Sequence, residues 1–328
     1  MKLAIVILNW NGKKLLEEFL PSIIHYADSA DVYVIDNAST DDSVVFLTHT
    51  FPTIKQVVLT ENFGFAKGYN EGLKQIDADL YCLLNNDVEV TENWLKPLIQ
   101  AFEKTNVSIA QPLLLQHKER SRFDYAGAAG GFIDKLGFPY CRGRIFNVLE
   151  ENTNQYNETQ NCFWASGACF FVRQNVWKEL GGFDEDFFMH QEEIDFCWRA
   201  FNAGKITQTV GASVVYHVGG ASLAPSPRKT YYNHRNSLWM MLKNLPKAFL
   251  FPILLQRFIL DGIAGIQYLL KGNFASFFMV IKAHLVVYGT LKRTINKRQA
   301  GFSKKQYFHQ RSIVWNHFIL RKSKFLDL

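Results

Sequence analysis

The sequence predicts an α/β fold whose central sheet is mainly parallel. Short apolar runs alternate with segments of helical apolar spacing through the first 90 residues, as in strand–helix repeats. Polar side chains stand at the ends of three of the predicted strands, at Asn9, at Asp36 and in the run Asn85-Asn86-Asp87. Because ligands bind at the carboxyl ends of strands in open α/β sheets, these observations predict a ligand site at one sheet edge.

The predicted strands follow from apolar runs that end at polar or turn-forming residues. They are Lys2–Leu8, Asp31–Ile35, Val57–Leu59 and Leu80–Leu84. Between the first two strands, Lys13–Tyr26 shows the spacing of an amphipathic helix. Ser39 or Asp41 is expected to cap a second helix, which carries Val44, Val45 and Leu47. Residues 111–160 have no clear pattern, and we expect a variable insertion or flap there.

The fourth strand ends in the stretch Asn85-Asn86-Asp87-Val88-Glu89. Hard divalent cations such as Mg²⁺ take carboxylate oxygens and share their remaining ligands with phosphates. We therefore predict a metal–diphosphate site at Asp87, with Glu89 as a weaker ligand candidate. The alternative is a strand-to-turn cap, since Asn and Asp are common turn residues.

Other nucleotide-binding patterns are absent from the sequence. Asp36 could accept a hydrogen bond from a ribose hydroxyl or a base, or it could be a turn residue. Gly64, Gly68 and Gly72 would allow close approach of a ligand or of neighbouring helices. They form neither GxGxxG nor GxxxxGK[ST], which disfavours a dinucleotide fold and excludes P-loop chemistry.

Length and charge divide the chain of 328 residues into two regions. Residues 226–328 contain 18 Lys and Arg but only two Asp and no Glu, so their net charge is +16. Residues 1–225 have a net charge of −10. We place the boundary near Ala224-Pro225-Ser226-Pro227, where two prolines interrupt the chain. An acidic first region and a basic second region suggest different partners for the two.

The cysteines indicate a reducing compartment, because their number is odd and no CxxC pair occurs. They are Cys82, Cys141, Cys162, Cys169 and Cys197. The first apolar run, Ile5–Leu8, is too short for the core of a signal peptide. We therefore expect a cytoplasmic location.

Several motifs in a fixed order resemble the family 2 glycosyltransferases, and within them the rhamnosyltransferase-like branch. The segments that carry the resemblance are 6–11, 34–41, 62–70, 84–87, 164–168, 181–188, 192–199 and 217–222. Leu84-Asn85-Asn86-Asp87 is similar to the loose form of the family's metal motif, in which only the last carboxylate is kept. The resemblance spans residues 1–224.

The resemblance implies a GT-A fold and transfer from a nucleotide-diphosphate sugar with inversion at the anomeric carbon. It implies Mg²⁺ or Mn²⁺ at Asp87, with His217 as a second ligand or else a satisfied core histidine. The donor-binding residues that it implies are Leu8, Asn9, Asp36, Asn62, Gly64, Lys67, Asn70 and Asn86. The residues that it implies on the acceptor side are Trp164, Ser166, Gly167, His190 and Glu192. Core packing is the alternative for Trp164.

The base that takes the acceptor proton is expected in the segment Glu192-Glu193-Ile194-Asp195. Relatives usually have Glu-Asp-x-Asp, with the base at the second position, where this chain has Glu193. Glutamate can perform the same proton transfer with one more methylene of reach. Asp195 and Glu192 are the fallbacks, although Asp195 lies four residues before Arg199 and could form a structural ion pair.

The basic C-terminal region alternates apolar runs with cations. Ala248–Leu260 and Leu269–Thr290 are mostly apolar, but Lys271, Lys282 and His284 interrupt the second. We expect helices that lie in the membrane interface, with basic residues at anionic headgroups. The basic residues expected to form this patch are Lys292, Arg293, Lys297, Arg298, Lys304 and Lys305. The alternatives are a helical packing or homo-oligomerisation domain and, least favoured, a nucleic-acid surface.

Taken together, the sequence predicts a glycosyltransferase on the inner face of the cell membrane. Its donor would be a dTDP- or UDP-sugar, with dTDP-rhamnose as the first candidate. Its acceptor would be a saccharide, lipid-linked, in cell-surface polysaccharide synthesis. One rival is a non-catalytic nucleotide-sugar-binding or scaffold subunit. A nucleotidyltransferase is disfavoured because a glycine-rich, basic N-terminal loop is missing.

Overall fold

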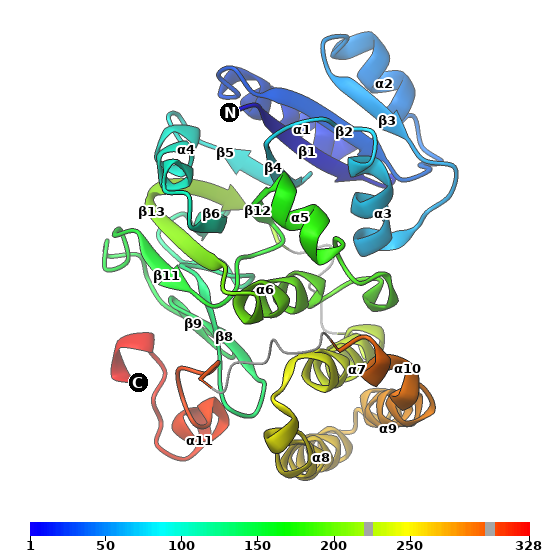
Figure 1. Cartoon of the computed structure of the whole chain (residues 1–328), viewed down its shortest axis with the longest axis vertical. Coiled ribbons are helices and arrows are strands. Elements are labelled where there is room, and N and C mark those ends of the chain that lie inside the picture. Colours follow the sequence, from blue (N-terminus) through cyan, green and yellow to red (C-terminus); the bar gives the residue numbers. More distant parts are fainter. Residues whose placement is uncertain (220–225, 299–305) are drawn as a thin grey trace.

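The structure, a computed structural model, describes residues 1–219, 226–298 and 306–328. The segments Gly220–Ser222 and Ala224-Pro225, and the cations Lys304 and Lys305, on which earlier expectations fall, lie outside the described residues. Figure 1 shows a sheet flanked by helices, with a further group of helices at the end of the molecule away from α2 (Ser43–Thr50) and β3 (Lys55–Val58).

The centre is a nine-stranded mixed sheet. Its other strands are β1 (Leu3–Asn9), β2 (Asp31–Asp36), β4 (Leu80–Asn85), β5 (Val88–Val90), β6 (Val107–Gln116), β11 (Gln160–Cys162), β12 (Cys169–Arg173) and β13 (Ile206–His217). The order is β11-β13-β6-β12-β4-β1-β2-β3, with β5 beside β13. The pairs β1–β2, β1–β4 and β2–β3 are parallel, whereas β12 runs antiparallel between β4 and β6. The mainly parallel N-terminal half is confirmed, and the strands that follow make the whole sheet mixed.

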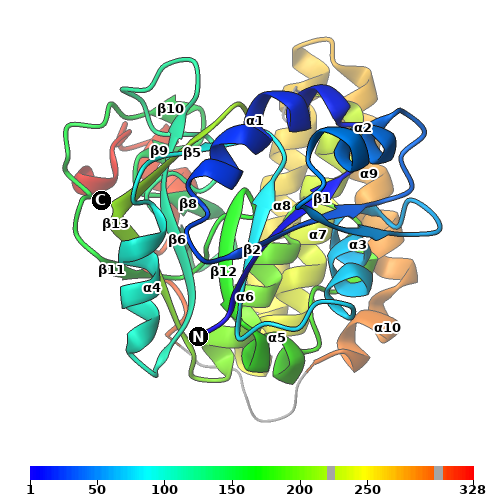
Figure 2. The same cartoon turned by 90° about the horizontal axis from the view of Figure 1, so that it is seen from above.

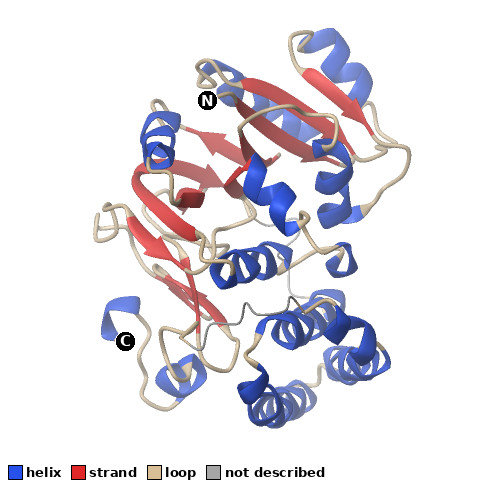
Figure 3. Ribbon diagram, in the orientation of Figure 1, coloured by secondary structure: helices blue, strands red, loops and turns tan. Residues whose placement is uncertain are grey.

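Helices cover both faces of this sheet and enclose two apolar cores (Figures 2 and 3). They are α1 (Lys13–His25), α2, α3 (Gly64–Leu73), α4 (Leu95–Glu103), α5 (Gln174–Leu180) and α6 (Glu192–Asn202). Strand β1 shows why both cores form, since Val6 faces one core and Ile5 and Ile7 face the other. This alternation follows from the two-residue period of a strand.

The predicted helix starts are close to the observed ones. Helix α1 begins at Lys13, as expected. At α2, the Oδ1 atom of Asp41 accepts from the backbone N–H of Ser43 at 3.0 Å, while Ser39 Oγ accepts from Asn11 N–H instead. The N-cap of α2 is Asp42, which makes no side-chain capping hydrogen bond, so neither Ser39 nor Asp41 is confirmed as the cap.

The expectation of a flap over residues 111–160 is wrong for its first part. Pro112–Leu115 belongs to β6, which pairs with β12 and β13 in the middle of the sheet. Residues 131–149 within the remainder form a separate four-stranded antiparallel sheet. Its strands are β7 (Gly131–Ile133), β8 (Pro139–Cys141), β9 (Arg144–Ile145) and β10 (Val148–Leu149). Single-sequence patterns missed β6 because it is buried on both faces and therefore shows no alternation.

The basic region forms α7 (Pro227–Asn244), α8 (Lys247–Leu270), α9 (Phe274–Gly289), α10 (Leu291–Asn296) and α11 (Ile313–Phe318), followed by a 3₁₀ turn at Phe325–Asp327. The apolar stretch Leu269–Thr290 is not one helix. It breaks between α8 and α9 at Gly272, which has a φ of +71° that glycine adopts without strain.

Ion pairs join the two regions. Lys243 Nζ lies 2.6 Å from Asp184 Oδ2 and 2.7 Å from Asp195 Oδ2. Lys297 forms ion pairs with Asp184 and Asp186, and Arg293 forms an ion pair with Asp186. The basic region is thus docked against acidic residues of the first region, and the division near residue 225 stays a prediction.

These contacts correct the expected headgroup patch. Arg293 and Lys297 are used in ion pairs within the molecule. Arg298 donates to the carbonyl oxygens of Leu242 and Leu245. Arg293 and Lys297 therefore hold the helices to the first region, and Arg298 is hydrogen-bonded within the basic region.

Candidate functional site

The ends of β1, β2 and β4 meet at one edge of the sheet, as the sequence predicts. Asn9 pairs in register with Asp36, and Leu8 with Asn85. Asn9 is fully buried; its Nδ2 donates to Asp36 Oδ2 at 3.3 Å, and its Oδ1 accepts from Asn86 Nδ2 at 3.0 Å. The structure therefore brings Asn9, Asp36 and Asn86 into one hydrogen-bonded group.

The next expected donor residues shape the loop that leads into α3. Asn62 Oδ1 accepts from Asn37 Nδ2 at 3.1 Å and from the backbone N–H of Gly64 at 2.9 Å. Gly64 has a φ of +75°, and a Cβ there would lie 2.6 Å from the ring of Phe188. Both residues have structural reasons for their identity, so their role toward a donor stays a prediction.

Lys67 and Asn70 lie on α3 and make contacts of their own. Lys67 Nζ sits 4.2 Å from the ring centroid of Phe63. Asn70 Nδ2 donates to the Phe183 carbonyl at 2.9 Å, and Asn70 Oδ1 accepts from Phe183 N–H at 3.0 Å. Because both ends of its amide are used inside the protein, the geometry does not favour Asn70 as a donor contact.

Asp87 and His217 lie together, although 130 residues separate them in the sequence. His217 Nε2 is 3.2 Å from Asp87 Oδ1, and its Nδ1 is 3.0 Å from Asp124 Oδ2. Burial alone would lower the pKa of His217, but the two carboxylates raise it to about 10. Burial would raise the pKa of Asp87, yet its contacts with His217 hold it below the usual value.

These side chains fit a divalent metal. Asp87 offers a hard oxygen, and His217 offers a ring nitrogen on the same side. Asp124 orients the other ring nitrogen, as carboxylates commonly do behind metal-binding histidines. Sequence reasoning missed Asp124, because nothing in its local sequence shows that it lies behind His217.

Glu89 does not join this group. Its Oε2 lies 2.7 Å from Arg120 Nη2 and 3.0 Å from His117 Nε2. A tight turn at Asn86-Asp87 separates β4 from β5, so Asp87 and Glu89 do not share a strand face. The weaker ligand candidate was therefore wrong.

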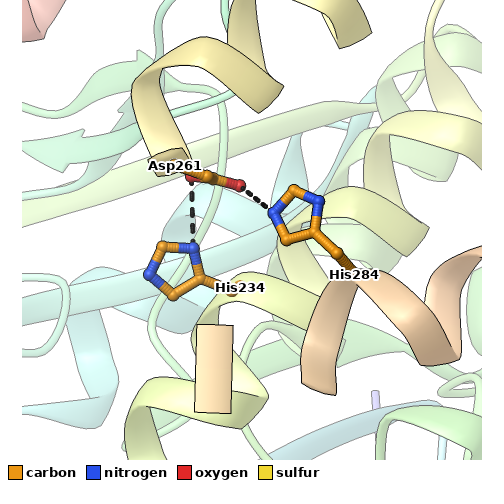
Figure 4. Close-up of side chains that lie close together, drawn as sticks. All are labelled: His234, Asp261 and His284. Carbon is orange, nitrogen blue, oxygen red and sulfur yellow. Dashed lines mark hydrogen bonds and ion pairs between the residues drawn. The ribbon is translucent and has the colours of Figure 1, made fainter. Parts of the chain in front are cut away.

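A second cluster with ligand-like spacing is present among the described residues. His234, Asp261 and His284 lie on α7, α8 and α9, and Figure 4 shows both imidazoles directed at the carboxylate. His234 Nδ1 lies 3.1 Å from Asp261 Oδ1, and His284 Nε2 lies 3.1 Å from Asp261 Oδ2. Arg257 Nη2 lies 3.6 Å from Asp261 Oδ1 and already supplies a positive charge. We therefore assign this cluster to joining the three helices rather than to holding a cation.

The structural basis for Asp124 gives a prediction. Asp124→Asn should weaken the binding of Mn²⁺ about 10–100-fold, because His217 loses the partner that orients its ring. Titration of the protein with Mn²⁺, monitored by electron paramagnetic resonance, measures this affinity. Glu119→Gln is the control, since Glu119 is exposed and pairs only with Arg122 among the described residues. Equal Mn²⁺ affinity of Asp124→Asn and the unmodified protein would remove Asp124 from the metal site.

The three acidic residues that begin α6 have different surroundings. Asp195 is fully buried, and its oxygens accept from Arg199 at 2.9 Å, from Lys243 at 2.7 Å and from Asn244 at 2.8 Å. Its contacts with Lys243 and Asn244 join the two regions, and its contact with Arg199 is an ion pair within α6. The geometry therefore does not favour Asp195 as a base.

Glu192 and Glu193 have no such partners. One carboxylate oxygen of each, Oε2, is buried without a hydrogen-bond partner in the part of the chain that the structure describes. Burial raises the pKa of Glu193 to about 7, and burial together with the neighbouring Glu193 raises the pKa of Glu192 well above its usual value. A carboxylate with a pKa near 7 is suited to general base catalysis at neutral pH.

Glu193 lines a cavity of about 310 Å³ between the small sheet, α6 and the C-terminal helices. Trp164 and His190 also line this cavity. The Trp164 ring is held by a hydrogen bond from its Nε1 to the Phe132 carbonyl at 2.9 Å. Burial, with the charges of nearby basic residues, lowers the pKa of His190 to about 4, so its ring is neutral at pH 7.

The other expected acceptor-side residues lie beside this cavity. A Cβ at Gly167 would be 3.8 Å from Glu193 Cγ, so the glycine leaves space next to the carboxylate. Ser166 Oγ donates to the Ala126 carbonyl at 2.6 Å, and Ser166 N–H donates to Gln111 at 2.8 Å. Ser166 is thus bonded within the protein.

The loop before Glu193 has a strained backbone. Phe188, His190 and Gln191 have φ values of +62°, +68° and +68°, a region that residues other than glycine rarely adopt. Asn236 on α7 holds this loop, because its Nδ2 lies 2.8 Å from the Met189 carbonyl and 2.7 Å from the His190 carbonyl. The basic region therefore helps to position the residues that precede Glu193.

Comparison with known proteins identifies the family. The model described as "Glycosyl transferase family 2" matches residues 4–181. The chain is 23% identical over 313 residues to an N-acetylglucosaminyl-diphospho-decaprenol L-rhamnosyltransferase of Mycobacterium tuberculosis, which covers 90% of this chain and 96% of that protein.

Two further relatives are similar over shorter lengths. The low-salt glycan biosynthesis hexosyltransferase Agl10 of Haloferax volcanii is 25% identical over 203 residues, which is 60% of this chain and 61% of that protein. The dTDP-rhamnosyl transferase RfbF of Shigella flexneri is 23% identical over 228 residues, which is 65% of this chain and 71% of that protein. The chain thus matches somewhat less than two thirds of Agl10.

Solved structures support the fold. TarS residues 1–349 of S. aureus in complex with UDP-GlcNAc has a TM-score of 0.58 and 16% identity, covering 91% of this chain and 84% of that chain. The mannosyltransferase PcManGT of Pyrobaculum calidifontis with GDP-Man and Mn²⁺ has a TM-score of 0.54 and 14% identity, covering 90% and 83%. At this level of identity the likeness concerns the fold alone.

Proposed function

We propose, from the premise that the chain belongs to glycosyl transferase family 2, that it moves a sugar from a nucleotide-diphosphate donor to a hydroxyl of a saccharide acceptor. The observation that carries this proposal is the environment of the Glu193 carboxylate. Its carboxylate has an unpartnered, buried oxygen, lines a cavity, and has a pKa raised to about 7. A buried carboxylate oxygen without a hydrogen-bond partner is costly for stability, which favours a catalytic reason for it.

In this proposal Glu193 is the base. The acceptor hydroxyl lies in the cavity against Glu193 and gives its proton to the carboxylate as its oxygen attacks the anomeric carbon. The bond from that carbon to the diphosphate breaks on the opposite face, so the configuration inverts. Trp164 provides a fixed wall that orients the acceptor sugar. His190 is neutral and does not compete for the proton.

Asn9, Asp36 and Asn86 would hold the nucleoside side of the donor at the sheet edge. Asp87 and His217 would hold the Mg²⁺ or Mn²⁺. A metal bound there would supply positive charge beside the diphosphate as it leaves. The mannosyltransferase PcManGT, which has a similar fold, was solved with Mn²⁺ and GDP-Man, and this supports proposing a divalent metal together with the donor here.

Rhamnose from a dTDP-linked donor is the sugar that we propose. The support comes from the names of two relatives, one an L-rhamnosyltransferase and one a dTDP-rhamnosyl transferase. The first of these acts, by its name, with a diphospho-decaprenol-linked sugar. We therefore propose a lipid-linked saccharide as the acceptor, in the synthesis of a cell-surface polysaccharide.

The C-terminal helices offer a surface for a membrane. Among the described helices, α8 is the one long and apolar enough to cross a bilayer. Its inner face carries the buried Arg257 and Asp261, whereas its outer face exposes large apolar residues. These are Phe251, Leu255, Ile259, Ile263, Ile266 and Leu270 on α8, with Phe274, Phe278, Ile281, Leu285 and Tyr288 on α9. A helix with one apolar face and one protein-bound face is suited to lying in the membrane interface.

This surface gives a prediction for membrane binding. The double change Ile259→Asp and Ile263→Asp should lower partitioning onto phosphatidylglycerol vesicles at least about tenfold, because two apolar side chains no longer leave water. Sedimentation with the vesicles measures partitioning. Val45→Asp is the control, since Val45 is 58% exposed on α2, like Ile259 and Ile263 on α8. Equal loss of partitioning in both variants, or no loss in the double variant, would contradict a membrane-binding role for this face.

The proposed function is tested by sugar transfer. The protein, with vesicles and Mn²⁺, is incubated with dTDP-rhamnose, UDP-sugars or GDP-mannose and with lipid-linked saccharide acceptors. The expected result is transfer from one donor with inversion. Binding of nucleotide diphosphate without transfer to any acceptor would favour a non-catalytic, nucleotide-sugar-binding subunit instead.

A further inference from the structure

The cavity that contains Glu193 has more polar atoms than a base and a sugar hydroxyl explain. Buried polar atoms without a hydrogen-bond partner among the described residues line it at Arg144 Nε, Gln191 Oε1, Ser237 Oγ and Arg257 Nε. An unsatisfied buried polar group costs about 1–3 kcal/mol, so such atoms seldom gather without a ligand. Several of these atoms are donors, which indicates a ligand with acceptor oxygens.

Two cations meet at one part of the cavity wall. Arg144, on β9, lies with its Cζ 4.5 Å from the ring centroid of Tyr125, and Lys229, on α7, lies with its Nζ 5.4 Å from the same centroid. All three residues line the cavity. Burial lowers the pKa of Lys229, and the charge of Arg144 lowers it further, which shows that the two cations act on each other. Like charges held together in a cavity favour an anion between them.

The protein itself does not neutralise Arg144 with a salt bridge among the described residues. Its guanidinium donates to the Phe146 carbonyl at 3.2 Å and to Cys141 Sγ at 3.5 Å. The charge of Asp124 raises the pKa of Arg144 from a distance, but the Asp124 carboxylate is paired with His217. Arg257, in contrast, has Asp261 as its counter-charge. Arg144 is therefore a buried cation in this wall whose charge an anionic ligand would neutralise.

We propose that Arg144 and Lys229 form a subsite for a phosphate group of the acceptor, so that the acceptor is a saccharide esterified to phosphate or diphosphate. This inference rests on the proposed function and names the chemical class of its acceptor. A guanidinium presents two parallel N–H donors to a phosphate, and an ammonium adds a point charge. Phe138 and Phe146 also line the cavity and provide an apolar path for the group that follows the phosphate.

The arrangement separates the ends of the acceptor. The sugar hydroxyl is placed at Glu193, on α6 of the first region. The phosphate is placed between Arg144, on β9 of the same region, and Lys229, on α7 of the basic region. Because α7 supplies Lys229 and α8 carries the exposed apolar face, a lipid that extends from the phosphate would lie beside the membrane surface proposed above. One cavity would thereby select acceptors that are both phosphorylated and lipid-linked.

The test measures binding rather than catalysis. Dodecyl diphosphate and dodecyl glucoside, each below its aggregation concentration, are titrated into the full-length protein in EDTA by calorimetry. Without a divalent metal, the Asp87 site contributes little to diphosphate binding. We expect dodecyl diphosphate to bind with one site per chain, and dodecyl glucoside to bind at least about tenfold more weakly, as loss of charge-assisted hydrogen bonds implies.

Variants then locate the site. Lys229→Met should weaken dodecyl diphosphate about tenfold or more, and Arg144→Gln should do the same; thermal melting confirms that each variant is folded. Arg228→Met is the matched control, because Arg228 is the preceding residue on α7, is exposed, and contacts the Phe188 and Tyr232 rings outside the cavity wall. Inorganic pyrophosphate, used as a competitor, separates recognition of the phosphate from recognition of the alkyl chain.

The outcomes separate this inference from the proposed function. Equal diphosphate affinity in Lys229→Met and Arg228→Met would overturn the subsite, as would equal affinity for the diphosphate and the glucoside. Nucleotide binding in the presence of Mn²⁺ is measured on the same samples. If that binding is present while the subsite fails, the acceptor assignment alone falls; if nucleotide binding is also absent, the proposed function falls with it.

Discussion

Glu193→Gln is expected to lower kcat for sugar transfer about 10²–10⁴-fold, the usual contribution of a general base. The amide keeps the size of the side chain but cannot take the proton of the acceptor hydroxyl. Binding of the nucleotide donor should be unchanged, since Glu193 lines the cavity on the acceptor side. Transfer rates at saturating donor and acceptor, together with donor affinity, measure the two effects separately.

The pKa of Glu193 fixes the pH dependence of the same reaction. The base acts only when ionised, and its pKa is raised to about 7 by burial. The rate of transfer should therefore rise as the pH increases through about 7 and level off above it. In Glu193→Gln the residual rate should lose this rise. Ionisation of a carboxylate whose pKa is raised by burial also destabilises the fold, so the variant should melt at a higher temperature than the unmodified protein at pH 8.

Glu18→Gln is the control for this experiment. Glu18 is exposed on α1, so its replacement should change neither the rate nor the pH profile. Full activity of Glu193→Gln would remove Glu193 as the base. If that occurs, Glu192 is the next candidate, because its Oε2 is also buried without a partner among the described residues.

Asp87→Asn is expected to abolish the metal-dependent part of donor binding and to lower kcat/KM at least about a hundredfold. Loss of residues that only orient metal ligands already costs 10–100-fold, so loss of a ligand itself should cost more. The asparagine can still bond to the backbone N–H of Gly219, which donates to Asp87 Oδ2 at 3.3 Å in the structure. The variant should therefore remain folded.

Mn²⁺ titration and donor binding with and without EDTA measure this effect. Glu89→Gln is the control, because Glu89 lies two residues away and pairs with Arg120 and His117 instead. If donor affinity depends on Mn²⁺ to the same extent in Asp87→Asn and in Glu89→Gln, the metal does not bind at Asp87.

The sequence was most informative where a strand delivers a polar residue to the sheet edge. Asn9, Asp36 and Asp87 each follow a buried strand, and the parallel register brings the ends of these strands together. His217 was found in the same way, at the end of β13. Local pattern and family motifs were sufficient here, because the sheet itself determines where such residues lie.

Contacts between distant segments could not be predicted. Asn236 holds the His190 carbonyl across 46 residues, and Lys243 meets Asp184 across 59. In the sequence, Arg293 and Lys297 are indistinguishable from cations of a membrane-facing patch. Their use in ion pairs with Asp184 and Asp186 appears only in the folded chain. The same holds for Arg144 and Lys229, which come from separate regions.

The most direct test of the account is calorimetric binding of dTDP, UDP and GDP, each with Mn²⁺ and with EDTA, to the unmodified protein and to Asp87→Asn. We expect that one nucleotide diphosphate binds in the presence of Mn²⁺, that EDTA removes this binding, and that Asp87→Asn lacks it. Absence of binding for every nucleotide, or binding that persists unchanged in EDTA and in Asp87→Asn, would contradict a metal-dependent donor site at the end of β4.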